Sequence, residues 1–128
     1  MRLLLDTHAL LWFAAGDLKL PLLARQAISN PDNERFVSAA SASEIATKTR
    51  RGKLAGGALA TDFLATIRAH GFRALSVNVQ DAQDAGNLPG PHADPFDRMF
   101  IAQALRRDLV LVSNETRFDV YRVARLWA

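Results

Sequence analysis

An apolar run near the start of the chain, Leu3-Leu4-Leu5, ends directly at the carboxylate of Asp6. A run without alternation is typical of a central parallel strand that is covered on both faces. The same layout returns at Leu109-Val110-Leu111-Val112, which is followed by Ser113-Asn114-Glu115. Each of the two predicted strands therefore delivers a carboxylate at its carboxyl end, where open α/β sheets carry their binding crevice.

The segments between these strands alternate between helical and extended patterns. Further strands are expected over 35–38, 72–77 and 123–127, and helices over 8–15, 22–28, 41–51, 59–70 and 81–85, with another beginning at 95. Because crossovers between parallel strands are right-handed, this order predicts an α/β fold with helices on both faces of a parallel sheet. A length of 128 residues suits one domain, 1–128.

The stretch His-Ala-Asp-Pro-Phe-Asp, residues 92–97, has the features of a helix start. Asp94 is the expected N-cap, Pro95 fits the first helical position, and Asp97 falls in the acidic first turn. These residues have a complete structural explanation as helix-terminal electrostatics. They also place two carboxylates one helical turn apart.

Glu44 follows the second predicted strand and has a structural explanation too. Ser41 and Glu44 fit a capping box that would open the helix over 41–51. Lys48 and the basic residues after it are expected to form the solvated end of that helix. Asp6 or Thr7 could likewise simply cap the helix over 8–15.

The predicted sheet brings these acids to one edge. Asp6, Glu115 and the helix start at Asp97 can meet there, with Glu44 on a neighbouring helix. Carboxylates brought together repel one another, and a divalent cation resolves this. Oxygen ligands without Cys or a His pair favour Mg²⁺ or Mn²⁺, and such a site suits phosphodiester hydrolysis.

The composition limits the other possibilities. Zero Cys excludes disulfides and thiolate zinc sites, and no apolar run approaches a transmembrane helix or a signal peptide, so a cytoplasmic location is expected. The formal net charge is +3, which permits a nucleic-acid partner without requiring one. The sequence carries no P-loop, dinucleotide-binding or serine-hydrolase motif.

Four segments together resemble the PIN-domain family, and more closely the VapC-type toxins of bacterial toxin–antitoxin pairs. They are Leu-Leu-Leu-Asp6-Thr-His, Ser-Ala-Ser-Glu44-Ile-Ala, Asp94-Pro-Phe-Asp97-Arg-Met-Phe-Ile-Ala-Gln-Ala and Leu-Val-Ser-Asn-Glu115. The resemblance covers essentially the whole chain. It implies a three-layer α/β/α domain with a central parallel sheet. It also implies a Mg²⁺- or Mn²⁺-dependent endoribonuclease that a VapB-like antitoxin inhibits.

The resemblance assigns roles to individual residues. Asp6, Glu44 and Asp97 match the family's acids, and Glu115 stands where the family usually has Asp. Asp94 is an additional acid, which we interpret as a lesser ligand or a cap. Substrate contacts are expected from the hydroxyls of Thr7 and Ser113, with local capping as the alternative, and Arg98 would contact phosphate or pair with an acid.

Two other functions compete with this interpretation. A phosphatase or phosphoacceptor domain could use Asp6 as its nucleophile, although His8 stands where the Asp-x-Asp pattern needs an acid. A PIN-like module could instead bind RNA or protein without catalysis.

The helix over 8–15 is apolar on every side at 10–13, which predicts full burial or contact with a homodimer partner or antitoxin.

Overall fold

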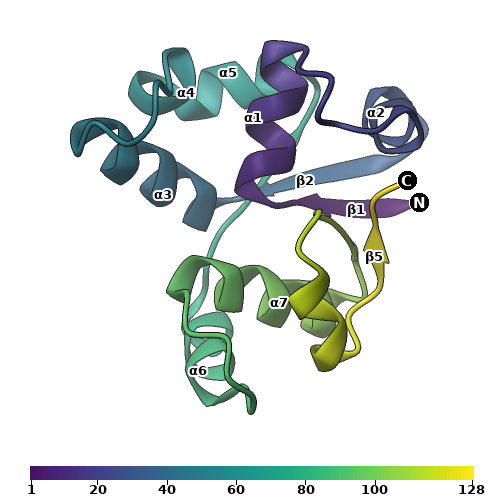
Figure 1. The fold of residues 1–128 in the computed structure, drawn as a ribbon, viewed down its shortest axis with the longest axis vertical. Helices are drawn as coiled ribbons and strands as arrows, with labels where there is room; N and C mark the ends of the chain where they lie inside the picture. Colours follow the sequence, from purple (N-terminus) through teal and green to yellow (C-terminus); the bar gives the residue numbers. More distant parts are fainter.

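The protein has a central sheet of five parallel strands, described for residues 1–128 by a computed structural model (Figure 1). The strand order across the sheet is β3-β2-β1-β4-β5. The strands are β1 (Arg2–Leu5), β2 (Glu34–Ser38), β3 (Arg73–Leu75), β4 (Val110–Val112) and β5 (Arg125–Leu126). The predicted parallel sheet is therefore confirmed, and β1 lies at its centre.

Helices cover both faces of this sheet, which confirms the expected three-layer architecture. One layer holds α1 (Thr7–Ala15), α2 (Leu22–Ser29), α3 (Ala39–Arg50), α4 (Ala58–Thr61) and α5 (Phe63–Ala69). The other holds α6 (Val79–Asn87), α7 (Pro95–Arg107) and the 3₁₀ helix η1 (Thr116–Tyr121). Figure 1 shows α1, α4 and α5 above β1 and β2, α3 to the left at the end of β2, and α6 and α7 below. No helix of this fold has the length and apolar character needed to cross a lipid bilayer.

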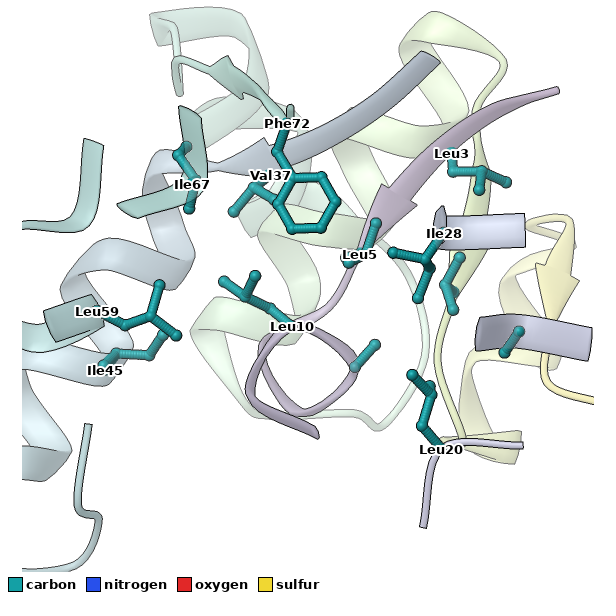
Figure 2. Close-up of a cluster of buried hydrophobic side chains, with 13 residues drawn as sticks. Leu3, Leu5, Leu10, Leu20, Ile28, Val37, Ile45, Leu59, Ile67 and Phe72 are labelled. Carbon is teal, nitrogen blue, oxygen red and sulfur yellow. The ribbon is translucent and has the colours of Figure 1, made fainter. Parts of the chain in front are cut away.

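The three leucines of β1 join two separate hydrophobic clusters. Leu3 and Leu5 belong to the cluster beneath α1 and α2, which Figure 2 shows, whereas Leu4 belongs to the cluster against α7. All three are fully buried. The unbroken apolar run is explained by this position, because a central strand needs apolar side chains on both faces.

The register of β1 sets the position of the first acid. Leu5 pairs with Val37 of β2 on one side and with Val112 of β4 on the other, and the Asp6 amide donates to the Val112 carbonyl at 3.1 Å. Asp6 and Ser113 therefore leave the sheet side by side at its carboxyl edge. The two strand-plus-acid segments of the sequence are neighbours in the fold.

Two predicted helices begin or run differently from expectation. The capping box at Ser41 is wrong, because α3 begins at Ala39 and its N-cap is Ser38, whose hydroxyl accepts from the Ala40 amide at 3.0 Å. Ser41 is instead a buried residue inside the helix. The helix expected over 59–70 is divided into α4 and α5 at Asp62.

A fully buried carboxylate joins α6 to α7. Asp81 accepts from Arg106 at 2.6 Å and from Arg107 at 2.9 and 3.0 Å, and it closes a capping box with Asn78. Burial acts to raise the pKa of Asp81, but the hydrogen bonds from Arg107, the Asn78 amide and Arg106 outweigh it and hold the pKa well below its usual range. This cluster fixes the helix that carries Asp94 and Asp97.

We expect Asp81→Ala to lower the free energy of unfolding by about 3 kcal/mol at pH 7, because it strands two arginines beside a buried gap. Since the folded pKa is depressed, the contribution is complete above the unfolded pKa of about 4 and is lost progressively as the pH falls from there toward the folded pKa, so part of it is already gone at pH 3. Urea denaturation at pH 7 and pH 3 measures both effects. Asp84→Ala is the control: this side chain is 37% exposed and bridges Arg106 at 3.4 Å, so its loss should cost less than about 1 kcal/mol.

Candidate functional site

A pocket of about 220 Å³ opens at the carboxyl edge of the sheet, and no hydrophobic residue lines it. We call it the acidic pocket. Its lining residues are Asp6, Thr7, His8, Glu44, Lys48, Asp94, Asp97, Asn114, Glu115 and Arg117. The structure thus brings together all five acids that the sequence analysis selected, from β1, α3, the start of α7 and the segment after β4.

Asp6 and Glu44 are the two buried acids of the pocket. Asp6 is the N-cap of α1, and its Oδ1 accepts from the Ala9 amide at 2.9 Å. Burial raises the pKa of Asp6 to about 6, and the neighbouring Asp97 charge adds to this, although hydrogen bonds from Ser113 and Ala9 oppose it. Asp6 therefore caps α1 and lines the acidic pocket with the same carboxylate.

Asp94 and Asp97 sit together at the start of α7. Asp94 is the N-cap, with its Oδ1 accepting from the Asp97 amide at 2.9 Å, as predicted. Asp97 Oδ2 is hydrogen-bonded to His92 Nε2 at 2.8 Å. Burial raises the pKa of Asp97, the His92 hydrogen bond opposes this, and the nearby Asp94 charge reinforces it.

His92 was not identified as a site residue from the sequence. Its side chain is 4% exposed, its ring packs edge-on against Phe118, and its amide donates to the Tyr121 hydroxyl at 3.2 Å. The ring is therefore held in one place while it contacts Asp97. The available signal was its position five residues before Asp97 in the same stretch, but the connecting loop has no period from which a contact could be inferred.

Glu44 is held by two neighbours. The Thr7 hydroxyl donates to Glu44 Oε1 at 2.6 Å, and Lys48 Nζ donates to Oε2. The Ser41 hydroxyl lies 3.1 Å from that of Thr7. Thr7 thus reaches the site by orienting an acid, and Lys48 belongs to the acidic pocket rather than to a solvated helix end.

Glu115 is bound by Arg117, another pocket residue that the sequence analysis missed. Arg117 Nε and Nη2 donate to its two carboxylate oxygens at 2.9 and 2.8 Å. The Arg117 guanidinium lowers the pKa of Glu115 to about 2. Ser113 is fully buried beneath this segment, where its hydroxyl accepts from the Glu115 amide at 3.0 Å.

Arg98 lies outside the acidic pocket, which corrects the expectation that it binds phosphate or pairs with an acid. Its guanidinium donates to backbone carbonyls of the α6 end and the following loop, those of Ala85, Gly86, Leu88 and His92. These bonds use most of its donors. Arg98 is a structural clamp beneath the start of α7.

The pocket offers the donors that a hard cation needs. Carboxylate and hydroxyl oxygens without thiolates suit Mg²⁺ or Mn²⁺. In the side-chain arrangement seen here, however, no three His, Asp or Glu side chains converge on one cation position. Glu44 and Glu115 are each bound to a cationic side chain in this arrangement.

Comparison with known proteins gives a consistent result. The PIN domain family model matches residues 3–124. The chain is 29% identical to ribonuclease VapC22 of Mycobacterium tuberculosis, over 95% of this chain and 93% of the relative. Among solved structures, it resembles VapBC2 from Rickettsia felis bound to a promoter DNA fragment, with TM-score 0.71, 14% identity and full coverage of both chains. It also resembles the sarcin–ricin loop-cleaving toxin VapC20 of M. tuberculosis, with TM-score 0.71, 16% identity, and 98% and 99% coverage.

The buried Asp6 charge has a consequence for stability. The pKa of Asp6 is raised from 3.8 to about 6 on folding, so the folded state binds this proton more tightly than the unfolded state does. The resulting stabilisation is complete below pH 3.8 and is lost as the pH rises through 6. Asp6→Asn keeps the helix cap, because Asn caps as well as Asp, and removes the buried charge. We expect the metal-free variant to be more stable than wild type by about 2 kcal/mol at pH 8.

The measurement is thermal or urea unfolding in EDTA at pH 4 and pH 8. At pH 4 the two proteins should differ little. Asp32→Asn, at an exposed turn outside the pocket, is the control. Its stability should match that of wild type at both pH values. An Asp6→Asn variant less stable than wild type at pH 8 would contradict the assignment of an uncompensated charge.

Proposed function

Because the chain belongs to the PIN domain family, we propose that it is a VapC-type endoribonuclease toxin that hydrolyses RNA phosphodiester bonds and is neutralised by a VapB-like antitoxin. The observation that carries this proposal is the convergence of Asp6, Glu44, Asp97 and Glu115 on one hydrophilic pocket. Four separate elements supply these acids. A structural role for each acid alone would not require them to face the same cavity.

We assign a Mg²⁺ or Mn²⁺ ion to this pocket. Asp6, Glu44 and Asp97 would hold it, with Glu115 completing the site and Asp94 as a lesser ligand. Bound there, the ion supplies an activated water and neutralises the charge that develops on the phosphate. The raised pKa values of Asp6 and Asp97 support this choice, because burial and, to a lesser extent, neighbouring carboxylates disfavour the charged form of each acid, and a bound cation would favour it.

The protein's own residues orient the ligands. Thr7 fixes one oxygen of Glu44, His92 fixes one oxygen of Asp97, and the Ala9 amide fixes one oxygen of Asp6. In each acid this bond leaves the second carboxylate oxygen for the pocket or, in Glu44, for Lys48. Such orienting contacts raise the affinity of a metal site and fix its geometry.

A partner surface is proposed over α1 and α2. Leu10 is buried in the core, but Leu11, Trp12 and Phe13 are only half-buried, so α1 is not enclosed by its own chain. Leu18, Leu22 and Leu23 beside it are largely exposed, at 92%, 68% and 56%. An apolar patch of this kind suits an antitoxin helix or a second copy of the chain, in a homodimer or a toxin–antitoxin hetero-oligomer.

RNA cleavage tests the catalytic assignment. We expect antitoxin-free protein to cut a structured RNA pool with Mg²⁺ or Mn²⁺ and not with EDTA. Asp97→Asn and Glu44→Gln should reduce the rate on the order of 100-fold or more, since even contacts behind a metal ligand are worth 10–100-fold. Asp32→Asn should cut at the wild-type rate. Cleavage that survives EDTA or both pocket substitutions would refute the proposal.

Tryptophan fluorescence tests the partner surface. The chain has two tryptophans, Trp12 and Trp127, whose rings lie 5.7 Å apart beside α1. Adding the protein encoded by the adjacent upstream open reading frame should abolish cleavage and shift the emission to shorter wavelength. Leu18→Ser combined with Leu22→Ser should weaken the complex while leaving cleavage intact. Full inhibition with unchanged emission would place the contact elsewhere.

A further inference from the structure

Lys48 and Arg117 are the only lysine and arginine that line the acidic pocket, which otherwise carries five carboxylates and His8. Each binds an acid close to it along the chain. Lys48 bridges Glu44 one turn earlier in α3, and Arg117 forms the two-point contact with Glu115. The two cations therefore neutralise two of the five acids.

These contacts divide the acids into two groups. Both oxygens of Glu44 are engaged, one by Thr7 and one by Lys48, and both oxygens of Glu115 are engaged by Arg117. In Asp94 and Asp97 a single oxygen accepts a hydrogen bond. Asp94 and Asp97 lie at the start of α7, and Asp6, which follows β1, is likewise bound to no cation. The two cation-bound acids lie on α3 and after β4.

Within each pair the cation is the freer partner. The Glu44 side chain is 5% exposed while that of Lys48 is 36% exposed, and the Glu115 side chain is 27% exposed while that of Arg117 is 68% exposed. Long exposed side chains change rotamer at little cost. Exchange of partners can therefore proceed by movement of the cations, with the acids remaining in place.

We propose that Lys48 and Arg117 are internal counter-ions that a divalent cation displaces, and that both then bind phosphates of the RNA beside the scissile bond. This inference rests on the proposed function. Once the acids are neutralised by the ion, the two displaced cations face the pocket without partners. A phosphodiester backbone supplies the missing anion, and the Arg117 fork and the Lys48 ammonium both suit phosphate oxygens.

The exchange makes metal and RNA binding mutually supportive. The divalent cation must compete with Lys48 and Arg117 for Glu44 and Glu115, so metal binding without RNA is weakened. RNA that captures the displaced cations removes this competition. By linkage, RNA strengthens metal binding by the same factor by which metal strengthens RNA binding.

The test is calorimetric titration of Mn²⁺ into antitoxin-free protein without RNA. We expect Lys48→Met and Arg117→Gln each to tighten Mn²⁺ binding about fivefold, the equivalent of one partly exposed ion pair. In cleavage assays at saturating Mn²⁺, each should raise KM for RNA about tenfold with a smaller change in kcat. Lys48→Arg should restore both quantities toward wild type.

Matched controls remove the same charge elsewhere. Lys53→Met and Arg68→Gln replace exposed residues outside the pocket and should leave both quantities unchanged. Unchanged or weaker Mn²⁺ binding by Lys48→Met and Arg117→Gln would overturn the exchange. If Lys48 and Arg117 merely supported Glu44 and Glu115, their replacement would weaken Mn²⁺ binding. Wild-type protein that binds no Mn²⁺ would instead refute the proposed function itself. Unfolding curves for every variant identify any that fails to fold, and Lys48 and Arg117 each provide an independent test.

Discussion

The pairing of β1 with β2 on one side and β4 on the other is the constraint on which the rest of the molecule depends. It places Leu5 between Val37 and Val112, so Asp6 must leave the sheet at the middle of its carboxyl edge. The helices that follow β1 and β2 then bring Thr7 against Glu44, and the segment after β4 brings Glu115 to the same side. A buried charge at the centre of a sheet is costly, and hydrogen bonds from Ser113 and the Ala9 amide to Asp6 lower that cost.

The contacts of the pocket's acids are of two kinds. Fixed donors such as the Ala9 amide at Asp6 orient an acid without removing its charge. Side-chain cations neutralise the buried Glu44 and the partly exposed Glu115, and each cation is more exposed than the acid it binds. The pocket thus combines fixed orientation of some acids with neutralisation of others by exposed side chains, and both properties suit the proposed binding of a cation and then of RNA.

Sequence patterns were sufficient for the sheet and for the positions of Asp6 and Glu115, because unbroken apolar runs and strand-end carboxylates are local signals. Glu44 and Asp97 also had helix-terminal explanations, and the family resemblance was needed to assign them to the same site. Sequence patterns were insufficient where a contact joins residues that no period relates. The His92 ring reaches Asp97 across an irregular loop, and Arg117 turns back onto Glu115 within a 3₁₀ segment. Ser41 and Glu44 satisfied the spacing of a capping box, but Ser38 lay nearer the strand end and started the helix first. Arg98 was misjudged because backbone carbonyls, which every sequence contains, were its true partners.

The hydrogen bonds of Arg98 also affect where the chain could be opened without disturbing the pocket. The loop between α6 and α7 is exposed at Pro89, Gly90 and Pro91, and exposed Pro/Gly loops are ordinarily where proteins tolerate new termini. Here Arg98 of α7 donates hydrogen bonds to the end of α6 and to the His92 carbonyl. The His92 imidazole is in turn hydrogen-bonded to Asp97. A circular permutant opened in this loop would keep both helices and the sheet, yet it would release the support of one acid. A surface segment that does not itself line the pocket thus helps to hold Asp97, one of the acids that do.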